Sequence, residues 1–290
     1  MTKYLFFTAY GKADIFRECK YALLRLIAVY EAAGKTPPEI ILYTDNPEAF
    51  SFVQDRLTLH IRRIGMDQIQ AWRGKYDFVF RPKIEMLREV VKTYEGKLLY
   101  VDCDTYCLQT LDGLFDLLDE KDVVMHNCEG SIGGAGNIHL RKWRSFLSRQ
   151  LPDALEMDMW NAGTIGFSQE HAPLLQEVLG LTDGLYPRFP RHTVEQFAFG
   201  YTYQWHGLHI HAAAPYLFHY WNLKEFRVIL ERFFEKYTTL PSMLEASTRI
   251  LPEIIHPDKM AYERISSFKR RVMKWRGRDW TIEPYLSLMD

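Results

Sequence analysis

The sequence predicts an α/β fold in which helices flank a mostly parallel sheet and a helical extension follows at the C-terminus. Short apolar runs alternate with longer segments that carry apolar residues at helical spacing, and Gly or Pro often separates them. A repeated strand–helix unit implies parallel strands joined by crossover helices. The 290 residues, 47% of them hydrophobic, suffice for one large domain or two small ones. We expect one domain over residues 1–265 and an extension over residues 266–290.

The first half of the chain shows the alternation most clearly. Strands are predicted at residues 4–8, 39–44, 59–64, 97–101 and 122–126. Helices are predicted at residues 16–33, 47–57, 82–94 and 111–118. Gly34 and Gly96 stand where helices should stop, and Pro82 occupies a first turn, where its missing N–H is not needed.

The second half is less regular. Residues 129–137 contain four glycines but lack the leading strand and following helix of a dinucleotide-binding loop, so we expect a surface loop, with a mobile loop beside the site as the alternative. The rest predicts a turn and short strand, the start of a helix, two extended segments and a long helix. These elements fall at residues 159–168, 192–198, 208–211, 216–218 and after residue 224.

Two carboxylates separated by one residue end the apolar run that follows Lys97. In an extended segment residues i and i+2 point the same way, so Asp102 and Asp104 should project together from the carboxyl end of the strand. Ligands of open α/β sheets bind at that edge. Paired carboxylates there suit Mg²⁺ or Mn²⁺ shared with a diphosphate, whereas the alternative is a solvated Asp-rich turn.

Charge and composition exclude several functional classes. The formal net charge of −1 gives no global basic field for nucleic acid. The N-terminus lacks the features of a signal peptide, and no apolar segment is long enough to span a bilayer. The four cysteines show neither zinc spacing nor a disulfide framework. We therefore expect a cytoplasmic protein with reduced thiols.

Four motifs follow one another in an order that is more specific than any one of them. They are Asp102-Cys-Asp104, Asn161-Ala-Gly163, Glu195-Gln196 and His219 followed by Lys224. From residue 4 to about residue 224 the chain resembles the GT-A glycosyltransferases. Within these it is most similar to the glycogenin-like and lipopolysaccharide galactosyltransferase family, which transfers a sugar from a nucleotide diphosphate with retention of configuration.

The resemblance implies roles for particular residues. Metal ligands for Mn²⁺ or Mg²⁺ would be Asp102, Asp104 and His219. Donor-binding residues would include Arg81 and Lys83, from an Arg-x-Lys pair, and Asn161 and Gly163, from the sugar-contacting turn. The remaining donor-binding candidates are Thr8, Tyr10, Asp45, Cys103 and Lys224. Glu195 and Gln196 would lie beside the reacting carbon as the catalytic pair.

The sequence departs from the family pattern in three places. Glu195 stands where the family usually has Asp. The late motif lacks the Gly and the Pro-Trp of the family, and Lys224 lies one residue closer to His219. The usual acidic residue after the first strand is absent from the segment Thr8-Ala9-Tyr10, so recognition of the base is expected to differ.

Each candidate residue also has a simpler interpretation. Gln196 completes a Thr-x-x-Gln capping box at a helix start. Asn161 suits an ordinary turn, His219 a strand end without metal, and Arg81 a surface ion pair. Cys103 should point into the sheet as a small apolar residue. The histidines 206, 209 and 211 are expected to form a polar face rather than a second metal cluster, unless a carboxylate lies nearby.

Residues 266–280 combine six basic side chains with aromatic residues and a single acid, Asp279. This composition suits a helix on anionic lipid at the inner face of the membrane. A helix packed on the domain with a solvated basic face is the alternative, and nucleic acid is a weaker one.

The sequence as a whole predicts a metal-dependent glycosyltransferase that moves a hexose from a UDP-sugar to a glycan or lipid-linked acceptor, with retention. The alternatives are an inverting transferase with Glu195 as general base and a nucleotide-sugar-binding protein without turnover. A sugar-1-phosphate nucleotidyltransferase is disfavoured, because no Gly-rich, Arg-containing phosphate loop follows the first strand.

Overall fold

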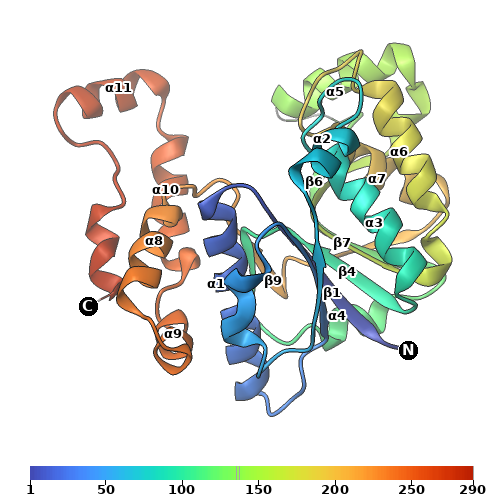
Figure 1. The fold of residues 1–290 in the computed structure, drawn as a ribbon. Helices are drawn as coiled ribbons and strands as arrows, with labels where there is room; N and C mark the ends of the chain where they lie inside the picture. Colours follow the sequence, from blue (N-terminus) through green and yellow to red (C-terminus); the bar gives the residue numbers. More distant parts are fainter. Residues whose placement is uncertain (135, 137, 290) are drawn as a thin grey trace.

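A seven-stranded sheet forms the centre of the molecule in the computed structural model, which describes residues 1–134, 136 and 138–289 (Figure 1). The strand order is β3-β2-β1-β4-β7-β6-β8, and only β7 runs antiparallel to its neighbours. The strands are β1 Lys3–Ala9, β2 Glu39–Thr44, β3 Leu59–Arg63, β4 Lys97–Val101, β6 Asp122–Ser131, β7 Asp158–Ser168 and β8 His209–Ala212. The predicted α/β fold with a mostly parallel sheet is confirmed.

Helices cover both faces of this sheet (Figure 1). On one face α1 (Ala13–Ala32) and α4 (Asp112–Leu117) share an apolar cluster with the strands. On the other face lie α2 (Met66–Trp72), α3 (Arg81–Thr93), α6 (Leu174–Leu185) and α7 (Val194–Trp205). A further helix, α5 (Ile138–Gln150), packs beside α7, and short 3₁₀ helices cover Pro47–Val53, Pro152–Glu156, Gln169–His171 and Glu283–Met289.

Helix α1 is buried on two sides, which explains its long apolar sequence. Its residues Leu23 and Leu26 contact the sheet, whereas Tyr21 and Leu24 belong to a separate apolar cluster formed with the C-terminal helices. The helix ends before Gly34, which adopts a φ of +63° that only glycine adopts without strain. The helix therefore joins the sheet to the C-terminal part of the chain.

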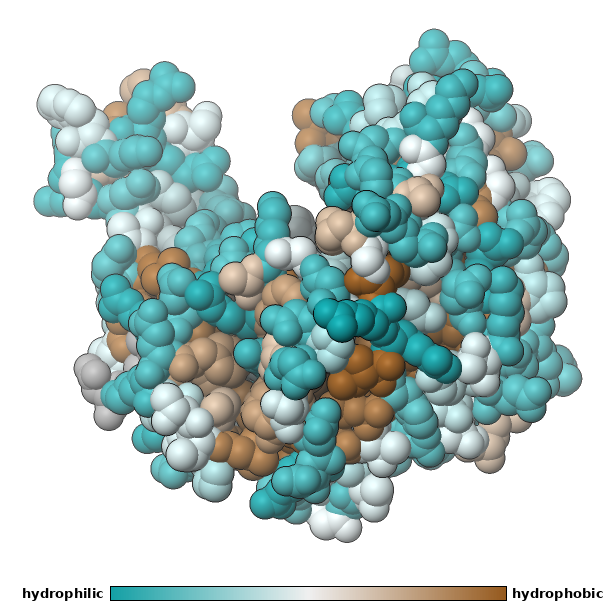
Figure 2. All heavy atoms as spheres, in the orientation of Figure 1, coloured by the Kyte–Doolittle hydropathy of each residue, from teal (hydrophilic) through white to brown (hydrophobic). Residues whose placement is uncertain are grey.

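The C-terminal helices α8 (Phe226–Lys236), α9 (Leu240–Ser247) and α10 (Pro252–Arg264) pack against α1. After α11 (Ser267–Trp275) the chain returns, and Trp280 and Ile282 join the same apolar cluster. Helix α11 itself has no buried residue and projects from the molecule (Figure 1). In the same orientation the surface is hollowed between the part that carries α11 and the part that carries α5 (Figure 2).

The prediction of a turn at Asn161 was wrong, because β7 is continuous from Asp158 to Ser168. The glycines of this strand resemble turn signals, but they are needed because neighbouring side chains pack closely against the strand. A Cβ on Gly166 would lie 2.8 Å from the Leu99 side chain on the neighbouring strand. Glycine in a strand often marks such a close approach.

Other differences are smaller. The predicted helix at 47–57 is a 3₁₀ helix that ends at Val53, and the predicted long helix after residue 224 is α8, of 11 residues. Helices α2, α5, α6, α9 and α10 were not predicted. The first part of the expected glycine loop, up to Ser131, continues strand β6, and residues 135 and 137 of that loop lie outside the described residues.

Candidate metal and donor site

The two carboxylates predicted at the end of β4 do project from that edge of the sheet. β4 ends at Val101, and the backbone N–H of Asp102 donates to the carbonyl of Gly163 on β7 at 2.8 Å. The chain then continues into a second, two-stranded sheet of β5 (Thr105–Cys107) and β9 (Leu217–His219). The Asp-x-Asp segment thus lies at the junction of the two sheets.

The pairing of β5 with β9 brings His219 to this junction, although it lies more than a hundred residues later in the chain. Thr105 and His219 are partners in the antiparallel register, and the N–H of Tyr220 donates to the carbonyl of Asp104 at 3.0 Å. His219 also needs room on the side of β7, where a Cβ on Gly163 would lie 2.2 Å from its Cε1 atom. Gly163 is therefore required for His219 to sit here.

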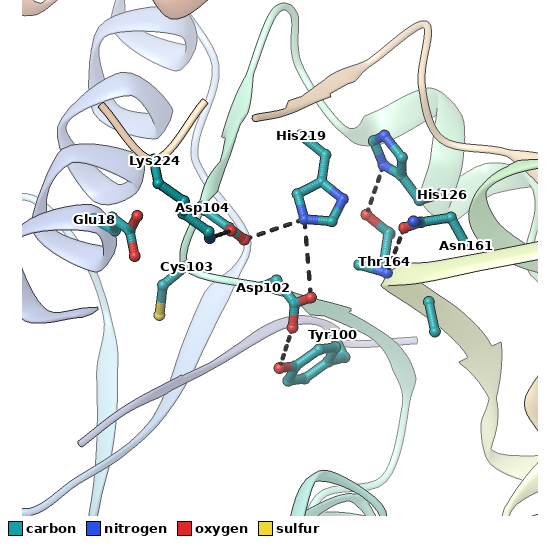
Figure 3. A network of polar contacts seen from close by, with 12 residues as sticks. Glu18, Tyr100, Asp102, Cys103, Asp104, His126, Asn161, Thr164, His219 and Lys224 are labelled. Carbon is teal, nitrogen blue, oxygen red and sulfur yellow. Dashed lines mark hydrogen bonds and ion pairs between the residues drawn. The ribbon is translucent and has the colours of Figure 1, made fainter. Parts of the chain in front are cut away.

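One oxygen of each carboxylate faces His219 (Figure 3). The Nε2 atom of His219 lies 3.1 Å from Oδ1 of Asp104 and 4.0 Å from Oδ2 of Asp102. The imidazole side chain is only 5% exposed, and among the described residues its Nδ1 atom has no hydrogen-bond partner. The ring of His126 lies edge-to-face at 5.0 Å, and burial and the charge of His219 lower the pKa of His126 to about 3.

The other oxygen of each carboxylate is held by the protein. The Tyr100 hydroxyl donates to Oδ1 of Asp102 at 2.6 Å, and the Lys83 ammonium lies 3.5 Å from the same atom. Lys224 donates to Oδ2 of Asp104 at 2.6 Å. Burial disfavours the charged form of Asp104, but His219 and Lys224 outweigh it and hold its pKa well below the ordinary range.

Lys83 forms the deepest ion pair of the site. Its Nζ atom lies 2.9 Å from Oε1 of Glu195 and 3.1 Å from the carbonyl of Ala162, and its side chain is 8% exposed. Burial lowers the pKa of Lys83, yet Asp102 and Glu195 raise it above its usual value. Burial raises the pKa of Glu195, and Lys83 opposes that shift. Lys83 therefore links the predicted metal ligand Asp102 to the predicted catalytic carboxylate.

Glu129, which was not predicted as a site residue, joins Asn161 to Gln196. The Asn161 amide donates to Oε1 of Glu129 at 3.1 Å, and the Gln196 amide donates to Oε2 at 2.8 Å. Gln196 therefore does not cap its helix, and the Thr193 hydroxyl accepts instead from the Trp143 indole at 3.0 Å. The antiparallel pairing of β6 with β7 creates this contact, which spacing along the chain does not reveal.

Lys224 is anchored by the start of α8. The guanidinium of Arg227, three residues later, donates to both oxygens of Glu18 on α1, at 2.8 and 3.1 Å. Glu18 is 2% exposed. This pair, also unpredicted, fixes α8 against α1 and therefore holds Lys224 at the site. Figure 3 shows Lys224 beside Asp104.

A cavity of about 780 Å³ opens over these residues. Nine predicted site residues line it, namely Lys83, Asp102, Asp104, Asn161, Gly163, Glu195, Gln196, His219 and Lys224. Glu129, Trp143, Arg191, His192 and Trp221 are among the lining residues that were not predicted. The size suits a small-molecule ligand.

Five predicted residues do not line this cavity. The Arg81 guanidinium is bound by Asp183 at 2.7 and 3.0 Å, as the surface-pair alternative expected. Cys103 points inward and donates to the carbonyl of Thr8. Tyr10 and Asp45 lie at the carboxyl ends of β1 and β2, where Asp45 accepts from the N–H of Gly11 at 3.1 Å. Their part in donor binding stays a prediction.

The donor atoms fit a hard divalent cation such as Mn²⁺ or Mg²⁺. One oxygen from each of Asp102 and Asp104 and one nitrogen of His219 lie within 4.8 Å of one another. Three protein ligands leave positions for oxygens of a diphosphate, and Mg²⁺ and Mn²⁺ sites with nucleotides are usually completed in that way. The outer oxygens, bound by Tyr100 and Lys224, orient the carboxylates as outer-shell partners do in metal sites.

Comparisons with known proteins agree with this architecture. No protein-family model and no curated protein sequence matches the chain. Among solved structures, the glycosyltransferase GlyE of Streptococcus pneumoniae TIGR4 is similar with a TM-score of 0.52 and 12% identity, over 84% of this chain and 63% of that one. The galactosyltransferase LgtC, in complex with donor and acceptor sugar analogs, is similar with a TM-score of 0.50 and 11% identity, over 72% of this chain and 73% of that one. The chain therefore has the GT-A-like fold of these glycosyltransferases.

Proposed function

We propose that this protein is a glycosyltransferase that uses Mn²⁺ or Mg²⁺ to transfer a hexose from a UDP-linked donor to a glycan or lipid-linked acceptor, with retention. The observation that carries the proposal is the convergence of the inner oxygens of Asp102 and Asp104 with Nε2 of His219 at the floor of the cavity. The likeness of the fold to glycosyltransferase structures supports it.

Each charged residue has a role in this reaction. Departure of a nucleoside diphosphate builds negative charge. Asp102, Asp104 and His219 would hold a divalent ion, which would neutralise that charge as a Lewis acid. Lys224 lines the cavity beside Asp104, and half of its side chain is exposed. Its ammonium group can therefore bind a phosphate oxygen of the donor. Lys83 stays with Asp102 and Glu195 and fixes both carboxylates.

The surroundings of Glu195 favour retention over inversion. A general base must reach the acceptor proton and pass it to solvent. Glu195 is 3% exposed and one of its oxygens is paired with Lys83, so it is a poor proton acceptor for an incoming hydroxyl. Its negative charge is better suited to stabilising the positive charge that develops on the sugar ring. The amides of Asn161 and Gln196, oriented by Glu129, lie along the same wall and suit the sugar hydroxyls.

Metal and nucleotide should bind together. We expect UDP to bind more tightly in the presence of Mn²⁺ and Asp104→Asn to abolish that increase, because the metal then loses a charged ligand. Transfer or donor hydrolysis by the variant should fall by about 10²–10³-fold. Isothermal titration of UDP with and without Mn²⁺ measures the effect. Asp116→Asn, an exposed carboxylate on α4, is the matched control. Equal UDP affinity with and without metal would refute the proposal, and metal-dependent binding without any hydrolysis or transfer would favour the binding-protein alternative.

The configuration of the released sugar distinguishes the two mechanisms. We expect the hexose first released from the donor to keep the configuration of its anomeric carbon, and Glu195→Gln to leave residual activity because the residue is not the proton acceptor. Rapid NMR of the anomeric proton, before mutarotation, measures the first point. Glu177→Gln, an exposed carboxylate on α6, is the control for the second. An inverted sugar, together with complete loss of activity in Glu195→Gln, would instead assign Glu195 as the general base.

Helix α11 supports the second part of the proposal, an acceptor presented at an anionic membrane surface. Phe268 and Trp275, seven residues apart and therefore on one face of the helix, are 74% and 84% exposed. Six basic side chains and only Asp279 as an acid lie within residues 266–280. Among the described residues, no helix is long and apolar enough to cross a membrane. Exposed aromatic residues beside basic ones suit a helix that lies in the interface.

Point substitutions test this contact better than truncation, because residues 280–288 pack on the C-terminal core. We expect the double variants Phe268→Ser/Trp275→Ser and Lys269→Glu/Arg271→Glu to lose sedimentation with anionic vesicles, since each basic residue near such a surface contributes about 1 kcal/mol. Donor hydrolysis in solution should persist in both. Lys75→Glu, an exposed residue elsewhere, should bind as the parent does. If the parent protein ignores anionic vesicles at low salt, the membrane contact is wrong.

A further inference from the structure

A second cluster of metal-ligating side chains lies where β6 and the edge strand β8 begin. Asp122 and His209 are partners in the parallel register of these strands, and His211 follows two residues later. Residues i and i+2 of a strand share a face, so all three side chains point to the same side. Val123, which follows Asp122, and Ile210, which lies between the two histidines, point to the other side and belong to the core under α3 and α6.

The three side chains bring three lone-pair atoms together. Oδ1 of Asp122 lies 3.0 Å from Nδ1 of His209 and 2.5 Å from Nε2 of His211. The two imidazole nitrogens are themselves 3.0 Å apart. Hydrogen bonds satisfy this arrangement poorly, because both rings would donate to one oxygen while their N–H groups crowd each other. A cation at the centre would instead accept a lone pair from all three atoms.

We propose that Asp122, His209 and His211 form a zinc site, distinct from the manganese or magnesium site at Asp102 and Asp104. Two imidazoles and one carboxylate are the ligand types of borderline divalent metals such as Zn²⁺. With Zn²⁺ bonds of about 2.0–2.2 Å, tetrahedral ligand atoms lie about 3.3–3.6 Å apart. The three atoms here are 2.5–3.0 Å apart, so small outward rotations of these side chains would admit the ion. Three protein ligands and an exposed His209 leave a position for water. From the sequence these histidines were expected to form only a polar face, because no carboxylate lies near them in the chain. The pairing of β6 with β8 brings Asp122 beside them.

The position of the site indicates a structural role. Strands β4 and β6 both run antiparallel to β7 and hence in the same direction. Asp102 follows the carboxyl end of β4, whereas Asp122 lies at the amino end of β6. The two sites therefore lie at opposite ends of the strands. Bound zinc would fasten the last strand, β8, to its one neighbour. The chain then leads from β8 into β9, which carries His219.

Zinc titration of the full-length protein tests the proposal. The carboxylate–histidine cluster of the donor site could also take up Zn²⁺, so the parent for this test is Asp104→Asn. We expect it to bind one Zn²⁺ by isothermal titration, to melt at a higher temperature with Zn²⁺, and to give the visible absorption of a low-symmetry site with Co²⁺. Adding His209→Ala should weaken Zn²⁺ binding at least about tenfold and remove the Co²⁺ bands. Asp122→Asn, which preserves shape, should do the same.

The control in that background is His206→Ala, which removes an exposed histidine that pairs with Glu177 outside the cluster. It should bind Zn²⁺ as Asp104→Asn does. Because the side chain of His209 is 70% exposed, His209→Ala should melt at the parent temperature without metal. The proposal is overturned if Asp104→Asn takes up no Zn²⁺, or if His209→Ala and Asp122→Asn bind it as tightly as the control.

Discussion

The concentration of negative charge at one edge of the sheet is the constraint on which the rest of the structure depends. Asp102, Asp104, Glu195 and Glu18 all lie within this region, and the last two are almost completely buried. Buried carboxylates are tolerated only when cations or hydrogen-bond donors accompany them. Each of the four has such a partner: Lys83 serves Asp102 and Glu195, Lys224 serves Asp104, and Arg227 serves Glu18.

These partners come from widely separated parts of the chain, so the charges also organise the fold. Lys83 lies on α3 and Glu195 on α7, and their ion pair joins the two helices beside Asp102, which follows β4. Arg227 on α8 reaches Glu18 on α1 and so draws the C-terminal helices toward the sheet edge. Tyr100 and Lys83 hold the outer oxygen of Asp102, and Lys224 holds that of Asp104. The inner oxygens remain directed at His219. In the proposed reaction a metal and a diphosphate would bind at these inner oxygens.

The sequence allowed the mostly parallel sheet, the strands of the first half of the chain, and the outward direction of Asp102 and Asp104 to be predicted, because strand periodicity is a local property. His219 was nominated by the order of motifs, and the β5–β9 register explains why it lies at the metal ligands. Contacts that arise only from pairing across the sheet were not accessible. Glu129 meets Asn161 through the antiparallel pairing of β6 with β7 and meets Gln196 on α7 through a side-chain hydrogen bond. Asp122 meets His209 through the register of β6 and β8.

The predicted turn at Gly163 and the capping alternative for Gln196 fail for one physical reason, namely that a local signal can serve tertiary packing instead. Gly163 looked like part of a turn but is small because the imidazole of His219 lies against it. Gln196 looked like a helix cap but donates to Glu129 across the cavity wall. In both cases a residue type that favours one local structure was used to satisfy a neighbour distant in sequence.

Pulsed electron paramagnetic resonance of Mn²⁺ bound to the protein with UDP would test the central claim most directly. If the inner oxygens of Asp102 and Asp104 and Nε2 of His219 hold the metal together with the diphosphate, the spectrum should contain both ³¹P and imidazole ¹⁴N couplings. The ¹⁴N coupling should then disappear in His219→Ala, while it should persist in the surface variant His206→Ala. A ternary mixture that shows neither coupling, or an ¹⁴N coupling unchanged in His219→Ala, would contradict the account.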